Sequence, residues 1–97
     1  MSSKQWKVGL LGAGYIIDVH AKSLINQGNV EIVAVCDHAV TRAESAASSF
    51  NIPQVFSSLD EMLKADLDAV HILLPPDLHF DCAKQIIESG RHVFLEK

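Results

Sequence analysis

Long apolar runs, basic clusters and closely spaced cysteines are all missing from this 97-residue sequence. No uninterrupted apolar run approaches the roughly 20 residues of a membrane-spanning helix, and the polar first residues do not resemble a signal peptide. The eight lysines and arginines are scattered singly and the formal net charge is -4, which disfavours nucleic acid or an anionic membrane as a partner. The sequence therefore predicts a cytoplasmic protein that binds a small molecule.

Cysteine is scarce, with Cys36 and Cys82 as the two examples, and each lies inside an apolar segment. Neither belongs to a CxxC pair or to a cysteine–histidine cluster at metal-ligand spacing. We expect two reduced and largely buried thiols, and we predict no metal site.

What the sequence does contain is a regular alternation of two patterns. Short apolar runs typical of buried strands alternate with segments whose apolar residues recur at helical spacing. The length suits one domain, and the short connections favour a parallel α/β sheet with right-handed crossovers. We predict a doubly wound Rossmann domain with strand order 3-2-1-4-5. Its strands lie at 8–11, 31–36, 54–56, 69–74 and 92–95, and its helices at 15–27, 41–50, 59–64 and 78–89.

Helix ends are also marked in the sequence. Two pairs have the spacing of a capping box, in which a hydroxyl and a glutamate three residues later satisfy free backbone N–H groups. Asp77 is expected to cap the last helix, and Gly90 stands where a C-terminal glycine belongs. The two capping-box pairs are Thr41 with Glu44 and Ser58 with Glu61.

The first motif with chemical content is Gly12-Ala13-Gly14, between the first strand and the first helix. Gly12 permits a tight turn, Gly14 lets a pyrophosphate approach the backbone, and the helix N-terminus adds partial positive charge. The third small residue of the dinucleotide fingerprint is replaced by Ile17, which suggests a slightly wider helix–strand spacing. This position after a strand predicts a dinucleotide-binding turn.

Asp37 stands at the end of the second strand, where a carboxylate can accept hydrogen bonds from the adenosine ribose. The same charge repels a 2′-phosphate, so we expect NAD to be preferred over NADP. Arg42 lies just beyond and can in principle meet a 2′-phosphate, which keeps NADP open as an alternative.

Two further stretches complete a recognisable set: 74–79, which reads LPPDLH, and 90–97, which reads GRHVFLEK. Together with the glycine turn and Val35-Cys36-Asp37, they resemble the N-terminal domain of the Gfo/Idh/MocA (glucose–fructose oxidoreductase / inositol dehydrogenase) family. The resemblance spans almost the whole chain. It implies an NAD(P)-dependent oxidoreductase or dehydrogenase that transfers hydride from a sugar, cyclitol or related polyhydroxy compound.

The resemblance also assigns residues and partners. Lys97 would be catalytic, beside the nicotinamide and the reacting hydroxyl. The substrate domain, which would also build a homo-oligomer, is absent from this chain. The implied cofactor-binding residues are Gly12, Gly14, Tyr15, Ile16, Asp37, Pro75, His79, Glu96 and Lys97.

The chain ends at Lys97, directly after a strand and at the sheet edge where ligands bind. We therefore expect residues 1–97 to be a dinucleotide-binding domain truncated after its last strand, and to be inactive alone. Two alternatives stay open: a non-catalytic module that binds or senses the dinucleotide, and a methyltransferase. Lys97 disfavours the first, while the 75–79 stretch and the Glu96-Lys97 ending disfavour the second.

Overall fold

The computed structural model describes residues 5–14, 17–26, 28–74 and 76–95, and its centre is a five-stranded parallel sheet. The strand order is β3-β2-β1-β4-β5, which confirms the predicted Rossmann topology. Because β1 occupies the middle of the sheet, it pairs with β2 on one side and β4 on the other. The strands are β1 (Trp6–Leu11), β2 (Val30–Cys36), β3 (Gln54–Phe56), β4 (Ala69–Ile72) and β5 (His92–Leu95).

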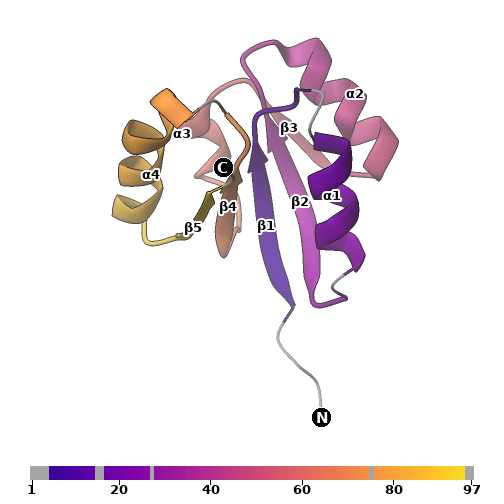
Figure 1. Cartoon of the computed structure of the whole chain (residues 1–97), viewed down its shortest axis with the longest axis horizontal. Coiled ribbons are helices and arrows are strands. Elements are labelled where there is room, and N and C mark those ends of the chain that lie inside the picture. The colour runs from indigo at the N-terminus through magenta and orange to yellow at the C-terminus, as the bar shows by residue number, and fades with distance from the viewer. Residues whose placement is uncertain (1–4, 15–16, 27, 75, 96–97) are drawn as a thin grey trace.

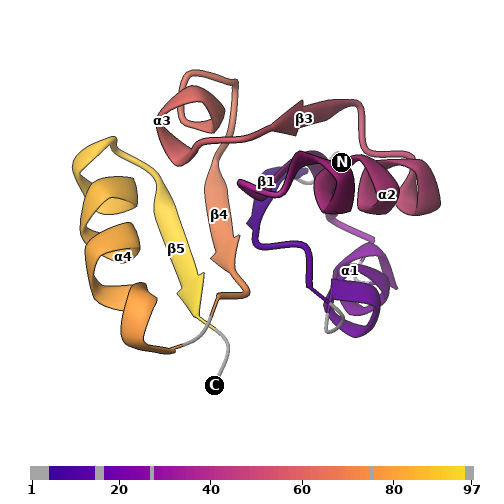
Figure 2. The ribbon, with the colours of Figure 1, turned by 90° about the horizontal axis from the view of Figure 1, so that it is seen from above.

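Helices cover both faces of this sheet, so the domain has three layers. Two helices pack on one face and two on the other, as Figure 1 and the view from above in Figure 2 show. Right-handed crossovers produce this division, because β1 leads toward one edge of the sheet and β4 toward the other. The first face carries α1 (Ile17–Asn26) and α2 (Val40–Phe50); the second carries α3 (Leu59–Met62) and α4 (His79–Glu88).

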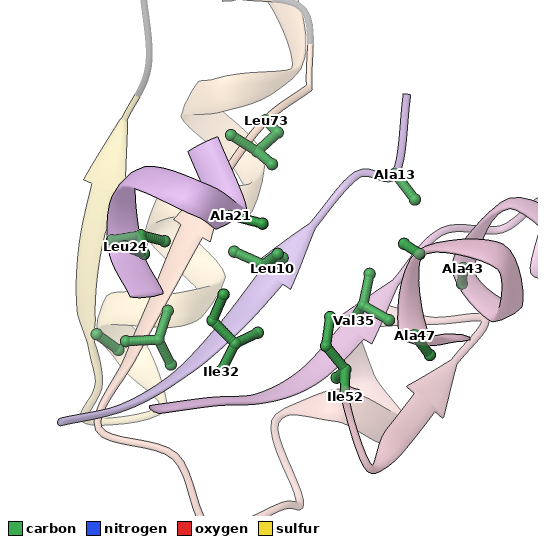
Figure 3. Close-up of a cluster of buried hydrophobic side chains, with 13 residues drawn as sticks. Leu10, Ala13, Ala21, Leu24, Ile32, Val35, Ala43, Ala47, Ile52 and Leu73 are labelled. Atoms are coloured by element: carbon green, nitrogen blue, oxygen red, sulfur yellow. The ribbon is translucent and has the colours of Figure 1, made fainter. Parts of the chain in front are cut away.

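The core on the α1/α2 face is built largely from small helix residues against branched strand residues, as Figure 3 shows. Alanine on the helix lets α2 approach the sheet closely, and Leu10 in the central strand is fully buried. Close packing of this kind is the main favourable term for a domain of this size. The helix residues are Ala21, Leu24, Ala43, Ala46 and Ala47, and the strand residues are Val8, Leu10, Ile32, Val35 and Ala69.

The two predicted capping boxes have different outcomes. The Ser58 hydroxyl accepts the Glu61 N–H at 3.2 Å, so the cap of α3 is confirmed. The prediction for Thr41 is wrong, because α2 begins at Val40 and Thr41 lies inside its first turn. The N-cap of α2 is Ala39, whose own N–H is taken by a side chain of the preceding turn.

The segment after β4 also departs from prediction. The strand ends at Ile72, two residues earlier than predicted, although the N–H of Leu73 still donates to the Leu11 carbonyl at 2.8 Å. Asp77 does not cap α4; it lies inside a 3₁₀ turn (Pro76–Leu78), and α4 begins at His79. The end of α4 is as predicted, with Gly90 at a φ of +88° that favours glycine.

Within the described ranges, the structure contains no helix of the length and apolarity needed to cross a bilayer.

Neighbouring isoleucines on α4 provide a direct test of how the second face is packed. Ile86 is fully buried, whereas Ile87 is 59% exposed. Ile86→Ala should lower the free energy of unfolding by about 2–5 kcal/mol, because it leaves a cavity. Ile87→Ala should change it by less than about 0.5 kcal/mol. Urea unfolding of both variants measures this, and equal losses would show that α4 presents a different face to the sheet.

Candidate dinucleotide-binding site

Three turns of interest meet at one edge of the sheet. Because the strands are parallel, β1, β2 and β4 all point their carboxyl ends to this edge (Figure 1). The glycine turn follows β1, Asp37 follows β2, and residues 73–79 follow β4. In open α/β sheets this edge is the place where ligands bind, since the strand order reverses there.

Gly12 has a backbone geometry that requires glycine. Its φ is +107°, and a Cβ at this position would lie 3.3 Å from the backbone carbonyl carbon of Leu73. Its N–H donates to the carbonyl of Cys36 at 2.7 Å, which ties the turn to the end of β2. Gly12 therefore sets the sharp exit from β1, and any side chain there would strain it.

Gly14 has a different reason to be glycine. Its φ does not lie in the left-handed region, and a Cβ built on it would have nothing within 4 Å. The backbone thus borders open space at the edge of the sheet. This is the room that a pyrophosphate needs to reach backbone N–H groups, so the turn passes the steric test for a dinucleotide.

Asp37 links the glycine turn to the start of α2. Its Oδ2 accepts the Ala13 N–H at 2.9 Å, and its Oδ1 accepts the Ala39 N–H at 2.8 Å. The Arg42 guanidinium donates to the same Oδ1 at 3.2 Å. Since the side chain of Asp37 is only 6% exposed, these three donors make up most of its polar surroundings.

These contacts decide the charge state of Asp37. Burial by itself raises the pKa of the carboxyl group, but the Ala39 and Ala13 N–H groups and the positive charge of Arg42 together outweigh burial. The net result is a pKa below its ordinary value of 3.8. Asp37 is therefore ionised at neutral pH and can accept hydrogen bonds but not donate them.

The thiol of Cys36, directly before Asp37 in the chain, is not a reactive group. Burial, followed by the charge of Asp37, raises the pKa of Cys36 to about 11. A thiol that stays protonated is a weak nucleophile, so Cys36 acts as a packing residue beneath the turn. Within the described part of the chain, no cluster of three or more histidines, cysteines or acids is arranged to hold a metal ion.

Several predicted site residues lie outside the described residues: Tyr15, Ile16, Pro75, Glu96 and Lys97. His79 begins α4 at the same edge of the sheet, directly after the 3₁₀ turn, and only its backbone is described. The structure therefore brings together Gly12, Gly14 and Asp37 from the predicted set.

Sequence reasoning missed the donors that hold this edge together. Ala13 and Ala39 act through backbone N–H groups, which every residue except proline carries, so the sequence gives no signal for them. The sequence suggests Arg42 as a partner for a 2′-phosphate, whereas in the structure it pairs with the Asp37 carboxylate. Its place five residues after Asp37, in the first turn of α2, was the available signal.

The lowered pKa of Asp37 predicts a pH-dependent stability. The stabilising contribution of the Asp37 carboxylate is complete above about pH 4. It is lost as the pH falls through the pKa of the folded state, which is lower than the ordinary pKa. Asp37→Asn should reduce the free energy of unfolding at pH 7 by about 1–3 kcal/mol, because an amide cannot accept all three donors. The deficit should shrink at pH 2–3. Urea titrations across this range test it, with Glu88→Gln on the exposed end of α4 as a control for losing one charge.

Residues 6–97 match the family described as the oxidoreductase family with an NAD-binding Rossmann fold. Inositol 2-dehydrogenase of Rhizobium meliloti is 36% identical over 92 residues, which are 94% of this chain and 27% of that protein. The scyllo-inositol 2-dehydrogenase (NADP(+)) IolU of Bacillus subtilis is 32% identical, over 94% of this chain and 28% of that protein.

A solved structure shows the same architecture. The scyllo-inositol dehydrogenase of Lactobacillus casei, crystallised with NAD(H) and scyllo-inositol, superposes with a TM-score of 0.88 at 28% identity. The match covers 97% of this chain and 28% of that one, so this chain spans about a quarter of the length of such relatives. By its family match over residues 6–97 and by its fold, the chain belongs to the Gfo/Idh/MocA family of oxidoreductases, which carry an NAD-binding Rossmann fold.

Proposed function

We propose that residues 1–97 form the dinucleotide-binding domain of an NAD-dependent dehydrogenase that oxidises a sugar, cyclitol or related polyhydroxy compound. The observation that carries this proposal is the glycine turn, held by Asp37 at the carboxyl edge of the sheet with open space beside Gly14. Two relatives are named inositol dehydrogenases, and a structural neighbour was crystallised with NAD(H) and a cyclitol, which supports the substrate class.

Different described residues would contact different parts of the cofactor. The N–H groups of the turn around Gly14 would meet the pyrophosphate, where the N-terminus of α1 adds partial positive charge. Asp37 would accept hydrogen bonds from the ribose hydroxyls, and its negative charge would favour NAD over NADP. Tyr15, Ile16, Pro75, His79 and Glu96 stay predictions as cofactor contacts.

The bound nicotinamide would supply an acceptor for hydride from the substrate carbon. On the protein side, we propose that Lys97 hydrogen-bonds the reacting oxygen and stabilises the negative charge that develops there, while the hydroxyl proton passes to a base of the substrate domain. The strand order supports this role, because β5 lies next to β4 and ends at the same edge as the glycine turn.

The remaining predictions concern the whole protein. A separate substrate domain would select the polyhydroxy compound and build a homo-oligomer, and the isolated 97 residues would not turn over substrate because cofactor binding positions only one reactant. Cytoplasmic location likewise stays a prediction.

Calorimetric titration of the 97-residue chain with NADH, NADPH and S-adenosylmethionine tests the proposal. We expect binding of NADH, weaker binding of NADPH and none of S-adenosylmethionine. Binding of S-adenosylmethionine alone would replace the dehydrogenase proposal with a methyltransferase.

A pair of glycine variants separates the cofactor role from the structural role. Gly14→Val should leave the urea midpoint nearly unchanged, because its Cβ meets nothing within 4 Å, and should abolish NADH binding by filling the pyrophosphate space. Gly12→Ala should instead lower the free energy of unfolding by at least about 1 kcal/mol, since its φ is +107°. A Gly14→Val variant that binds NADH normally would show that the phosphates lie elsewhere.

Lys97 is tested in a longer polypeptide that contains these residues together with the substrate domain. Lys97→Ala should lower turnover by roughly 100–1,000-fold, which is the usual cost of losing one donor to developing negative charge, and should change NAD affinity far less. Lys97→Arg should also be slow, because the larger, planar guanidinium does not place its charge where the compact ammonium does. Steady-state kinetics at saturating NAD provide the measurement. Turnover within about threefold of the parent would assign catalysis to the other domain alone.

A further inference from the structure

The exposed apolar side chains of this domain gather at one edge of the molecule. Six large apolar side chains are exposed among the described residues, and four of them lie between the 3₁₀ turn and β5: Leu78, Phe80, Ile87 and Phe94. Figure 2 shows α4 and β5 side by side at this edge. Monomeric proteins usually expose such side chains singly, so this concentration indicates a surface that binds another molecule.

Two sides of α4 contact its own domain, and a third is uncovered. Ile86 is fully buried against the sheet, and the Gln85 side chain donates to Asp60 on α3. Since each residue turns the helix by about 100°, Ile87 lies on the flank that faces away from α3, and it is 59% exposed. Phe80, which is 76% exposed, lies two turns earlier on this same outer flank.

The outer flank carries a groove of about 340 Å³, lined by Phe80, Ala83, Lys84, Ile87 and Glu88. Ala83 has the smallest side chain of the five, so another helix can approach closely there. Lys84 and Glu88 place opposite charges one helical turn apart on the same flank.

This order of charges makes the groove complementary to itself. When two copies of α4 pack antiparallel about a two-fold axis, Lys84 of each copy comes within reach of Glu88 of the other. Ile87 of each copy then packs beside Ala83 of the other, and every contact occurs twice. The net charge of -4 disfavours an anionic membrane as the alternative occupant.

We propose that the outer flank of α4 binds a second copy of this chain, in a two-fold dimer with antiparallel α4 helices. Phe80 lies over the last turn of the other α4 and is removed from water. Because the flank of one helix is a small interface, the dissociation constant lies in the micromolar-to-millimolar range. The inference does not depend on the proposed function, since Gly12, Gly14 and Asp37 lie outside α4.

Sedimentation equilibrium of the 97-residue chain, at concentrations up to millimolar, tests the proposal. The mass of the parent should rise with concentration from 10.6 kDa toward twice that value. Phe80→Ser should raise the dissociation constant about tenfold or more, because a large aromatic side chain is no longer buried. The matched control is Ile25→Ser: Ile25 is 46% exposed and lies on α1, so its loss should leave the dissociation constant unchanged. Urea midpoints of both variants should stay close to that of the parent, because both side chains are exposed in the monomer.

Charge reversal tests the two-fold arrangement itself. Lys84→Glu and Glu88→Lys should each weaken the dimer, because like charges then face each other across the axis. The double variant should recover the parental dissociation constant, because the exchanged charges attract again.

Three results would overturn the proposal. The first is a parent chain that stays at the monomer mass at millimolar concentration. If a longer polypeptide with the substrate domain then protects the α4 amides from hydrogen exchange, the flank belongs to that domain. The second is an equal weakening by Phe80→Ser and Ile25→Ser, which would indicate unspecific association. The third is a double charge variant that is no better than the single ones.

Discussion

The carboxylate of Asp37 holds together the edge of the sheet on which the site depends. It accepts the N–H of Ala13, in the turn after β1, and the N–H of Ala39, in the turn after β2, and only folding brings these two turns together. Since the side chain is buried, the loss of these bonds would leave polar groups without partners in a region that excludes water. The same negative charge serves a structural and a binding purpose, so the geometry of the glycine turn is established before any cofactor arrives.

The rest of the fold determines where this edge of the sheet lies. Central strands with apolar residues on both faces can exist only if helices cover both faces, and right-handed crossovers then bring the ends of β1, β2 and β4 together. Alanines on α2 bring that helix close to the sheet, which positions its first turn, with Ala39 and Arg42, beside Asp37. The packing of α2 on the sheet therefore controls distances at the carboxyl edge of the sheet.

Strand order and layer arrangement could be predicted because alternation of strands and helices leaves few topologies. Local helix ends could be predicted only in part. Ser58 and Thr41 have the same capping-box spacing, yet only Ser58 caps a helix. At Thr41 the Asp37 carboxylate takes the N–H of Ala39, and α2 begins two residues earlier than a cap at Thr41 would allow. A contact between residues in different turns thus overrides a local pattern.

The candidate site could likewise be predicted only in part. Gly12 and Asp37 could be identified from their positions after strands, because backbone conformation and charge are properties of the residue type. The three hydrogen bonds to Asp37 could not be identified, since two of their donors are backbone groups of alanine. The ion pair between Arg42 and Asp37 follows only from the geometry.

The most direct test of the central claim is a titration of the ¹⁵N-labelled 97-residue chain with NADH, followed by amide chemical shifts. If the dinucleotide lies at the carboxyl edge of the sheet, the shifts should concentrate in Gly12, Ala13, Gly14 and Ala39. Amides at the opposite edge, such as Asn29 and Gly90, should stay unchanged. Shifts concentrated at that opposite edge, or no shifts at millimolar NADH, would contradict the account.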